Sequence, residues 1–206
     1  MAEENFRFLN KSPICFALFT IISLEMRIIM EEFKVKDREL MYKGKIIDFY
    51  KDTIQLPDGR EAIWDYIDHK GAAAVVPVDD EGNIILVSQY RNAIQKQTLE
   101  IPAGGINKGE DPMTCAAREL EEETGYTVES IEPLTNIYTA IAYCNEIIYI
   151  YFAKVGEKKE QHLDDDEFVE VKKYSLNQLE EMILNGTIQD TKTISAILSY
   201  KLKYIG

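Results

Sequence analysis

The stretch that decides the fold is 104-GGINKGEDPMTCAARELEEETGY-126. It predicts a helix that begins after Asp111, a good N-cap followed by proline at the first helical position, and ends at Gly125, a good C-terminal cap. Four carboxylates stand at positions 119 and 121–123. Like charges three or four residues apart repel each other on a helix, so this concentration of negative charge requires a physical reason.

The helical wheel separates these carboxylates. At roughly 100° per residue, Glu119, Glu122 and Glu123 share an arc about 100° wide, whereas Glu121 points elsewhere. We expect a stripe of small and apolar residues to pack on a sheet: Met113, Ala116, Ala117, Leu120 and Thr124. Converging carboxylates raise each other's pKa values, and hard divalent cations relieve that repulsion. The alternative is a solvated helix face, the usual fate of a charge run.

Three neighbours extend the expected cluster. Glu110, on the Gly-rich loop, can fold back toward it. Arg118 lies four residues before Glu122, so it can pair with a carboxylate and fix its rotamer. Backbone carbonyls around Ala103 and Gly104 offer a further oxygen ligand for a metal, since glycines let the main chain approach closely.

This stretch resembles the Nudix box, with every defining position filled. The pattern reads here Gly104-x5-Glu110-x7-Arg118-Glu119-Leu120-x-Glu122-Glu123-x-Gly125-Tyr126. The resemblance implies an α/β fold, the Nudix α/β/α sandwich with a mixed sheet. It also implies hydrolysis of a nucleoside diphosphate linked to another group, with two to three Mg²⁺ or Mn²⁺ ions. By position, the implied metal ligands are Glu119, Glu122 and Glu123, assisted by Glu110, and Arg118 orients them.

Beyond the box, residues 35–205 are similar to ADP-ribose pyrophosphatases. The resemblance rests on an N-terminal strand pair, QYR at 89–91, LEIPAGGI at 99–106, DDDEFVEV at 164–171 and DTKTISAI at 190–197. It implies cleavage of ADP-ribose, a nucleoside diphosphate sugar, to AMP and ribose 5-phosphate. It also implies a homodimer that forms through the N-terminal sheet and shapes the nucleotide pocket from both subunits.

Candidate substrate-binding residues flank the box. They are Arg91 for a phosphate, Glu100, Gly104 and Gly105 around the loop, Trp64 (or Tyr66 or Tyr50) for stacking on adenine, and Glu146. The alternative for Arg91 is a surface salt bridge, and for the aromatic residues it is packing. Glu167 matches the catalytic glutamate of the subfamily, which positions or deprotonates water, with Asp166 as its substitute. The alternative there is a solvated acidic turn.

Two adjacent positions depart from the subfamily. Ile141, which lies 15 residues past Tyr126, and Ala142 stand where proline and glycine are usual. The departure leaves open another sugar nucleotide, a dinucleotide polyphosphate or a nucleoside triphosphate as substrate. A non-catalytic sensor of nucleotide sugars is a further alternative, which the intact box disfavours.

The rest of the chain sets the context. Its 206 residues include 23 basic and 36 acidic side chains, a net charge of −13, which argues against nucleic acid or an anionic membrane as partner. Three cysteines without a disulfide or metal-ligand spacing favour the cytoplasm. An apolar run within 13–25 is shorter than the roughly twenty residues needed to span a bilayer.

The pattern of elements predicts three parts. Residues 1–29 are an N-terminal extension without an assigned role, 30–69 form a small antiparallel sheet for dimerisation, and 70–206 form the Nudix domain. In the small sheet, strands are expected at 43–56 and 60–69. Near the end of the chain, helices are expected at 176–186, ended by glycine, and at 190–205. The apolar positions of the last helix are 194, 197, 198, 202 and 205.

Overall fold

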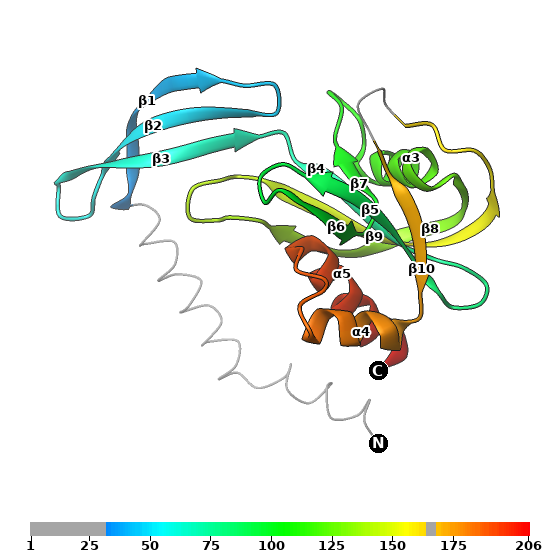
Figure 1. Ribbon diagram of the computed structural model, residues 1–206. Coiled ribbons are helices and arrows are strands. Elements are labelled where there is room, and N and C mark those ends of the chain that lie inside the picture. The colour runs from blue at the N-terminus through cyan, green and yellow to red at the C-terminus, as the bar shows by residue number, and fades with distance from the viewer. Residues whose placement is uncertain (1–31, 164–167) are drawn as a thin grey trace, which may run out of the picture. The chain divides into compact units, whose positions relative to one another are not determined.

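The computed structural model describes residues 32–163 and 168–206 of the chain (Figure 1). The chain divides into two compact units, one that ends at Ile67 and one that spans Asp68–Gly206. In the described ranges, no helix has both the length and the apolar character needed to cross a membrane.

The first unit is a three-stranded antiparallel sheet with the strand order β1-β2-β3. Its strands are β1 (Lys34–Lys43), β2 (Ile47–Gln55) and β3 (Glu61–His69). The predicted strand pair corresponds to β2 and β3, but β1 was not expected. All ten residues of β1 are exposed, so its sequence, KVKDRELMYK, carries no alternation of buried and exposed positions.

An ion pair joins the strands of this unit. The guanidinium of Arg38 on β1 donates to both carboxylate oxygens of Asp52 on β2, at 2.7 and 2.6 Å. It also lies over the ring of Tyr66 on β3, 3.8 Å from the centroid. Trp64, two residues earlier on β3, packs against Phe33 with ring centroids 5.8 Å apart. Polar and aromatic contacts therefore link the strands of this sheet in addition to their backbone pairing.

The second unit is a mixed α/β sandwich, as predicted. Its strands are β4 (Ala72–Val78), β5 (Ile84–Arg91), β6 (Lys96–Glu100), β7 (Ala103–Gly105), β8 (Tyr126–Tyr138), β9 (Ile147–Lys158) and β10 (Glu170–Tyr174). Its helices are α3 (Pro112–Thr124), α4 (Leu176–Leu184), α5 (Thr191–Tyr200) and a terminal π-helical turn, η2 (Lys201–Ile205). The sheet runs β10-β5-β4-β9-β8, with β4 parallel to β9 and the other neighbours antiparallel.

The large sheet splits between its two central strands. β4 and β5 pair only where Val78 meets Ile84. Beyond that point β4 pairs with β7, and β5 pairs with β6. The short segment Ile101–Pro102 crosses from β6 to β7, so the Gly-rich loop begins at the opening of the sheet.

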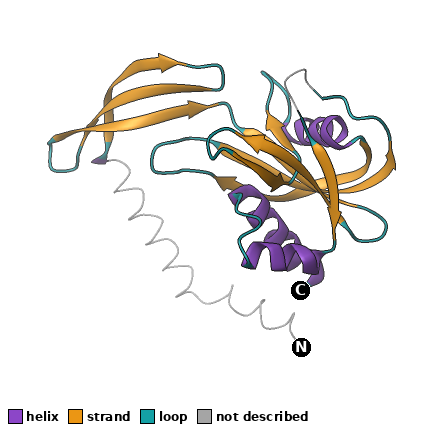
Figure 2. Cartoon of the chain, in the orientation of Figure 1, coloured by secondary structure: helices purple, strands orange, loops and turns teal. Residues whose placement is uncertain are grey.

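Helices cover both faces of this sheet (Figures 1 and 2). Side chains alternate along a strand, and Ala74 and Val76 of β4 pack in the cluster on the side of α4 and α5. Ala73 and Val75 pack in the cluster on the side of α3. All four are fully buried, as expected for a central strand covered on both faces.

The buried stripe of α3 differs from the predicted one. It consists of Cys115, Ala116, Leu120, Glu123 and Thr124. Met113, expected in this stripe, is 39% exposed, so that prediction was wrong. The helix is rotated so that Cys115 and one of the acidic residues, Glu123, face the interior.

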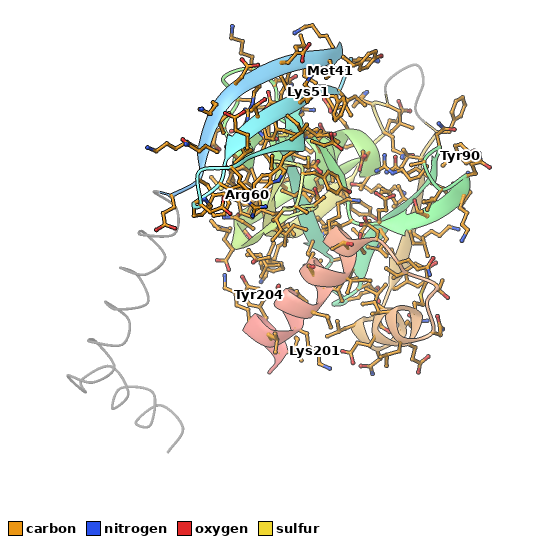
Figure 3. The ribbon with its side chains drawn as sticks, turned by 90° about the vertical axis from the view of Figure 1, so that its left-hand side faces the viewer. Met41, Lys51, Arg60, Tyr90, Lys201 and Tyr204 are labelled. Atoms are coloured by element: carbon orange, nitrogen blue, oxygen red, sulfur yellow. The ribbon has the colours of Figure 1, made fainter. Side chains whose placement is uncertain are left out.

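The stripe predicted for the last helix was also partly wrong. The buried residues of α5 are Lys192, Thr193, Ala196, Ile197 and Tyr200. Leu198, Leu202 and Ile205, which belong to the predicted stripe, are instead 42%, 78% and 59% exposed. The buried face includes a lysine because Lys192 pairs with Glu100. Beyond α5 the chain continues as η2, where Lys201 and Tyr204 lie (Figure 3).

Candidate active site

Helix α3 has the ends that the sequence predicts. The Oδ2 atom of Asp111 accepts hydrogen bonds from the backbone N–H groups of Met113, at 3.0 Å, and Thr114, at 3.2 Å. At the other end Gly125 adopts a left-handed φ of 75°, and its N–H donates to the carbonyl of Glu121 at 2.9 Å. These two caps fix where the helix starts and stops, and so fix its acidic residues relative to the Gly-rich loop.

Arg118 gathers three carboxylates around one guanidinium. Its Nε and Nη2 atoms donate to the two oxygens of Glu110, at 2.9 and 3.2 Å. Its Nη1 atom donates to Glu119 at 2.7 Å and to Glu122 at 2.8 Å. The Arg118 hydrogen bond, with one from the backbone of Asn107, lowers the pKa of Glu110 to about 2. The pKa of Arg118 is raised in turn, chiefly by Glu110.

Gly104 makes room for one of these carboxylates. A Cβ atom added at Gly104 would lie 2.0 Å from the Oε1 atom of Glu119 and 2.1 Å from its Cδ atom. The backbone of Gly104 does not have a positive φ. Glycine is therefore needed here for space and not for an unusual backbone conformation.

Glu123 lies beneath the loop. Its side chain is buried, and its Oε2 atom accepts a hydrogen bond from the N–H of Ala103 at 3.2 Å. The sequence places Glu123 on one arc with Glu119 and Glu122. In the structure, the hydrogen bond of Glu123 with Ala103 also ties the helix to the start of β7.

A cleft of about 410 Å³ opens above these groups. Its described lining consists of Ala103, Gly104, Gly105, Asn107, Arg118, Glu119, Glu122 and His162. Six of these eight are candidates from the sequence; Asn107 and His162 are not. Asn107 lies inside the box motif, at a position that the motif leaves open. His162 gives a weaker signal, as one of two histidines in the chain.

The cleft has the donor chemistry that a hard divalent cation prefers. Carboxylate oxygens of Glu119 and Glu122 line it beside the main chain of residues 103–105. Four carboxylates and one guanidinium, those of Glu110, Glu119, Glu122, Glu123 and Arg118, carry a formal net charge of −3. Among residues 32–163 and 168–206, no three acidic, histidine or cysteine side chains are already grouped around a point that would hold a metal ion. The guanidinium of Arg118 instead contacts three of these carboxylates, those of Glu110, Glu119 and Glu122.

Arg91 and Glu100 form a second charged group. The Nε and Nη2 atoms of Arg91 donate to the two carboxylate oxygens of Glu100, at 2.8 and 2.6 Å. Glu100 also pairs with Lys192, and it accepts a hydrogen bond from the Thr98 hydroxyl at 2.6 Å. Burial raises the pKa of Glu100, but Arg91, Lys192 and Thr98 outweigh it and lower that pKa to about 2. Neither Arg91 nor Glu100 is among the described residues that line the cleft.

The start of α5 holds the segment that leads into the cleft. The Thr193 hydroxyl accepts a hydrogen bond from the N–H of Ile101 at 3.0 Å, and it donates to the N-cap Asp190 at 2.6 Å. On the other side, the N–H of Val75 on β4 donates to the carbonyl of Pro102 at 3.0 Å. Residues 101–102 are thus fixed from two directions immediately before Ala103.

The remaining candidates lie elsewhere. Glu146 accepts a hydrogen bond from the Thr139 hydroxyl at 2.7 Å and lies 3.4 Å from the Nδ1 atom of His69; it does not line the described cleft. Trp64 belongs to the first unit, where it contacts Phe33. Asp166 and Glu167 lie outside the described residues.

The NUDIX domain family model matches residues 68–196, a range that includes every described residue that lines the cleft. The chain belongs to the Nudix family. Two relatives are ADP-ribose pyrophosphatases. That of Bacillus subtilis (strain 168) is 40% identical over 176 residues, 84% of this chain and 94% of that protein. That of Mycobacterium tuberculosis (strain ATCC 25618 / H37Rv) is 30% identical over 173 residues, 82% of this chain and 83% of that protein.

A third relative of this Nudix protein has a different name. The methanol dehydrogenase activator of Bacillus methanolicus is 38% identical over 177 residues, 85% of this chain and 95% of that protein. Among solved structures, that of an ADP compounds hydrolase matches with a TM-score of 0.73 and 18% identity, over 83% of this chain and 93% of that chain, which shows the shared fold. The family and the ADP-ribose pyrophosphatase relatives make this chain a Nudix pyrophosphohydrolase, as the sequence predicts.

Proposed function

We propose that this Nudix protein hydrolyses the pyrophosphate bond of ADP-ribose to give AMP and ribose 5-phosphate, with Mg²⁺ or Mn²⁺ as cofactor. The observation that carries the proposal is the cleft in which Arg118 holds Glu110, Glu119 and Glu122 together. It occurs in a chain 40% identical to an ADP-ribose pyrophosphatase over 94% of that protein.

The cleft residues have distinct roles in this proposal. Two to three cations would be held by Glu119, Glu122 and Glu123, with Glu110 and the Ala103 carbonyl assisting. When bound, a divalent metal would neutralise the negative charge of the phosphates and make the attacking water more acidic. Arg118 keeps the carboxylates oriented, because a planar guanidinium can serve several oxygens at fixed angles. Glu122 and Arg118 are therefore assigned to the catalytic group.

Substrate binding is assigned to residues around this group. Gly104 and Gly105 keep the main chain open at the cleft wall. Arg91 is assigned to a phosphate, with Glu100 as the buried carboxylate that orients its guanidinium. Trp64, 49% exposed, is assigned to adenine stacking ahead of Tyr50 and Tyr66, whose rings already contact Arg38.

Two further assignments rest on the subfamily resemblance. Glu146 is kept as a substrate-binding residue, although its carboxylate contacts Thr139. Glu167, with Asp166 as its substitute, is assigned to positioning or deprotonating the attacking water. Both of these acidic residues lie outside the described part of the chain.

A panel of substrates tests the proposal. Purified protein with Mg²⁺ is given ADP-ribose, two other sugar nucleotides, a diadenosine polyphosphate and a nucleoside triphosphate, with chromatography of the products. We expect ADP-ribose to give the highest kcat/KM, with loss of turnover in EDTA. Ile141 is 80% exposed where the subfamily has proline, so another sugar nucleotide is the second candidate. If that sugar nucleotide gives the highest kcat/KM in the panel, it replaces ADP-ribose as the proposed substrate.

The metal-dependent mechanism is tested by paired substitutions on α3. Glu122→Gln removes the charge of a cleft carboxylate, and we expect kcat/KM to fall by about 100-fold or more, since even residues behind metal ligands cost about 10- to 100-fold. Glu121→Gln is the matched control, because that side chain is exposed one position away. A wild-type rate in Glu122→Gln would show that the metal-cluster mechanism is wrong.

We also propose a homodimer formed through the small sheet. β1 exposes Val35, Leu40, Met41 and Tyr42 at 47–65% of their surface, and small sheets usually need a partner for stability. Light scattering at micromolar concentration is the test, and a monomer would contradict the proposal. The free thiols of Cys115 and Cys144 support assignment to the reducing cytoplasm.

A further inference from the structure

The cleft offers few hydrogen-bond donors to an anionic substrate. Among its described lining residues, Glu119 and Glu122 are acidic, and residues 103–105 contribute main chain. The Nε, Nη1 and Nη2 atoms of Arg118 are all engaged by carboxylates. The side-chain donors that remain in this described lining are those of Asn107 and His162.

Backbone and side-chain contacts fix the main chain at His162 against the end of α3. Its N–H donates to the carbonyl of Glu122 at 3.0 Å. The side chain of Gln161 donates to the carbonyl of Glu123 at 2.5 Å and to that of Val169 at 3.4 Å. The N–H of Lys159, three residues before His162, donates to the carbonyl of Gly125 at 2.7 Å. The segment 159–162 is therefore held to the helix that carries the acidic cluster.

The imidazole of His162 is available to a ligand. It lines the cleft, and within the described residues it forms no hydrogen bond or ion pair of its own. A neutral imidazole carries one N–H donor, so it can bind an anion without becoming charged. A diphosphate bound beside Glu119 and Glu122 brings oxygens that require such donors, because the surrounding carboxylates repel them.

We infer that His162 is a substrate-binding residue, whose imidazole donates a hydrogen bond to a non-bridging oxygen of the bound diphosphate. The inference rests on the proposed function, because it takes the cleft as the pyrophosphate site. It assigns the residue a role in binding and orienting the diphosphate.

The first test measures binding without turnover. Calorimetry with a non-hydrolysable α,β-methylene analogue of ADP-ribose and Mg²⁺ compares the wild type with His162→Ala and His162→Gln. A hydrogen bond to a charged group is worth enough to weaken binding by about 10- to 100-fold when it is lost. We expect that loss in His162→Ala and a partial recovery in His162→Gln, whose amide retains an N–H. In a separate activity assay, the Mg²⁺ concentration for half-maximal activation should be unchanged in both variants. Unchanged affinity in His162→Ala would overturn the inference.

Two further variants separate contact with the substrate from support of the segment. Gln161→Ala removes an anchor of the segment while it keeps the imidazole. Glu160→Ala changes an exposed neighbour and is the matched control. We expect Gln161→Ala to weaken analogue binding less than His162→Ala does, and Glu160→Ala to bind like the wild type. Equal losses in Gln161→Ala and His162→Ala, without recovery in His162→Gln, would show that His162 only supports the segment.

Failure of the proposed function gives a different pattern. If the wild type does not hydrolyse ADP-ribose, the substrate proposal fails, and KM is then compared in the same variants with the substrate that leads the panel. A raised KM in His162→Ala with that substrate would support the inference, and an unchanged KM would overturn it.

Discussion

Gly104 shows how the absence of a single side chain can matter at the candidate site. Gly104→Ala would place a methyl group 2.0 Å from the Oε1 atom of Glu119, so that carboxylate must leave its position. We expect kcat/KM to fall by about 10- to 100-fold, since displacements near 1 Å in an active site cost about 100-fold. The free energy of unfolding should change by less than about 1 kcal/mol, because the end of a glutamate side chain can move.

Gly105→Ala is the comparison for that prediction. A Cβ atom at Gly105 meets no atom within 4 Å, although the residue lines the same cleft. The loss of kcat/KM should therefore be smaller than in Gly104→Ala. Steady-state kinetics and urea unfolding of both variants provide the measurement, and equal kinetic losses would contradict the role of Glu119 crowding.

The residues that were predicted and those that were missed differ in how they reach the cleft. Glu119, Glu122 and Arg118 lie on one helix with recognisable caps, so spacing alone brings them together. His162 is positioned by a backbone hydrogen bond to Glu122, 40 residues earlier, and backbone hydrogen bonds leave no mark in the side-chain pattern. The burial of Glu123 was missed for a similar reason, since its partner is the N–H of Ala103.

At the scale of elements, the junction between α3 and the end of β9 carries a prediction. Gly125 and Gly186 both have a left-handed φ, of 75° and 78°. A Cβ atom at Gly125 would also lie 2.4 Å from the carbonyl oxygen of Lys159, whereas at Gly186 the nearest atom is 3.9 Å away. We expect Gly186→Ala to lower the free energy of unfolding by about 1 kcal/mol and Gly125→Ala by at least about 2 kcal/mol.

Chemical unfolding of both variants measures this difference. Gly125→Ala should also lose activity, because Lys159 leads into the segment that places His162 at the cleft. Gly186→Ala should keep it, since that glycine follows α4 and is not among the described residues of the cleft. Similar losses of unfolding free energy in the two variants would contradict the prediction, because they would show that a Cβ atom at position 125 next to the Lys159 carbonyl costs no stability.

Elements with a marked pattern were predictable, and elements stabilised by charge were not. Helix α3 and the hairpin strands β4 and β5 follow from caps, turns and apolar runs. Strand β1 was missed because it is rich in charged residues and has no buried face, so it shows no strand-like alternation. The stripe of α5 was misjudged because a lysine looks solvent-exposed in sequence, whereas Lys192 is buried against Glu100.

At the scale of the whole molecule, Glu100 makes stability depend on acid pH. Its pKa is lowered from 4.5 to about 2 in the folded state, so it stabilises the fold fully above pH 4.5. This contribution is lost as the pH falls from about 4.5 toward 2. At 1.36 kcal/mol per pKa unit, the loss amounts to about 3 kcal/mol.

Urea unfolding of the wild type and of Glu100→Gln across this pH range tests the dependence. At pH 7 the variant should be less stable by about 3 kcal/mol or more, because Arg91 and Lys192 lose their buried partner. The difference should shrink as the pH approaches 2, and Glu160→Gln, at an exposed position, should follow the wild type throughout. A difference that stays constant with pH would contradict the lowered pKa.

The parallel pairing of β4 with β9 has a consequence for how the protein is made. Ala72 pairs with Ile148, and the hydrogen bond from Ile101 to Thr193 spans 92 residues. Contacts so distant along the chain form late in folding, and a chain leaves the ribosome from its N-terminus. The Gly-rich loop and the acidic helix are thus synthesised well before β9 and α5 arrive to fix their positions. A nascent chain that stalls before α5 would carry every box glutamate and still lack a formed cleft, so its unfinished product would be inactive.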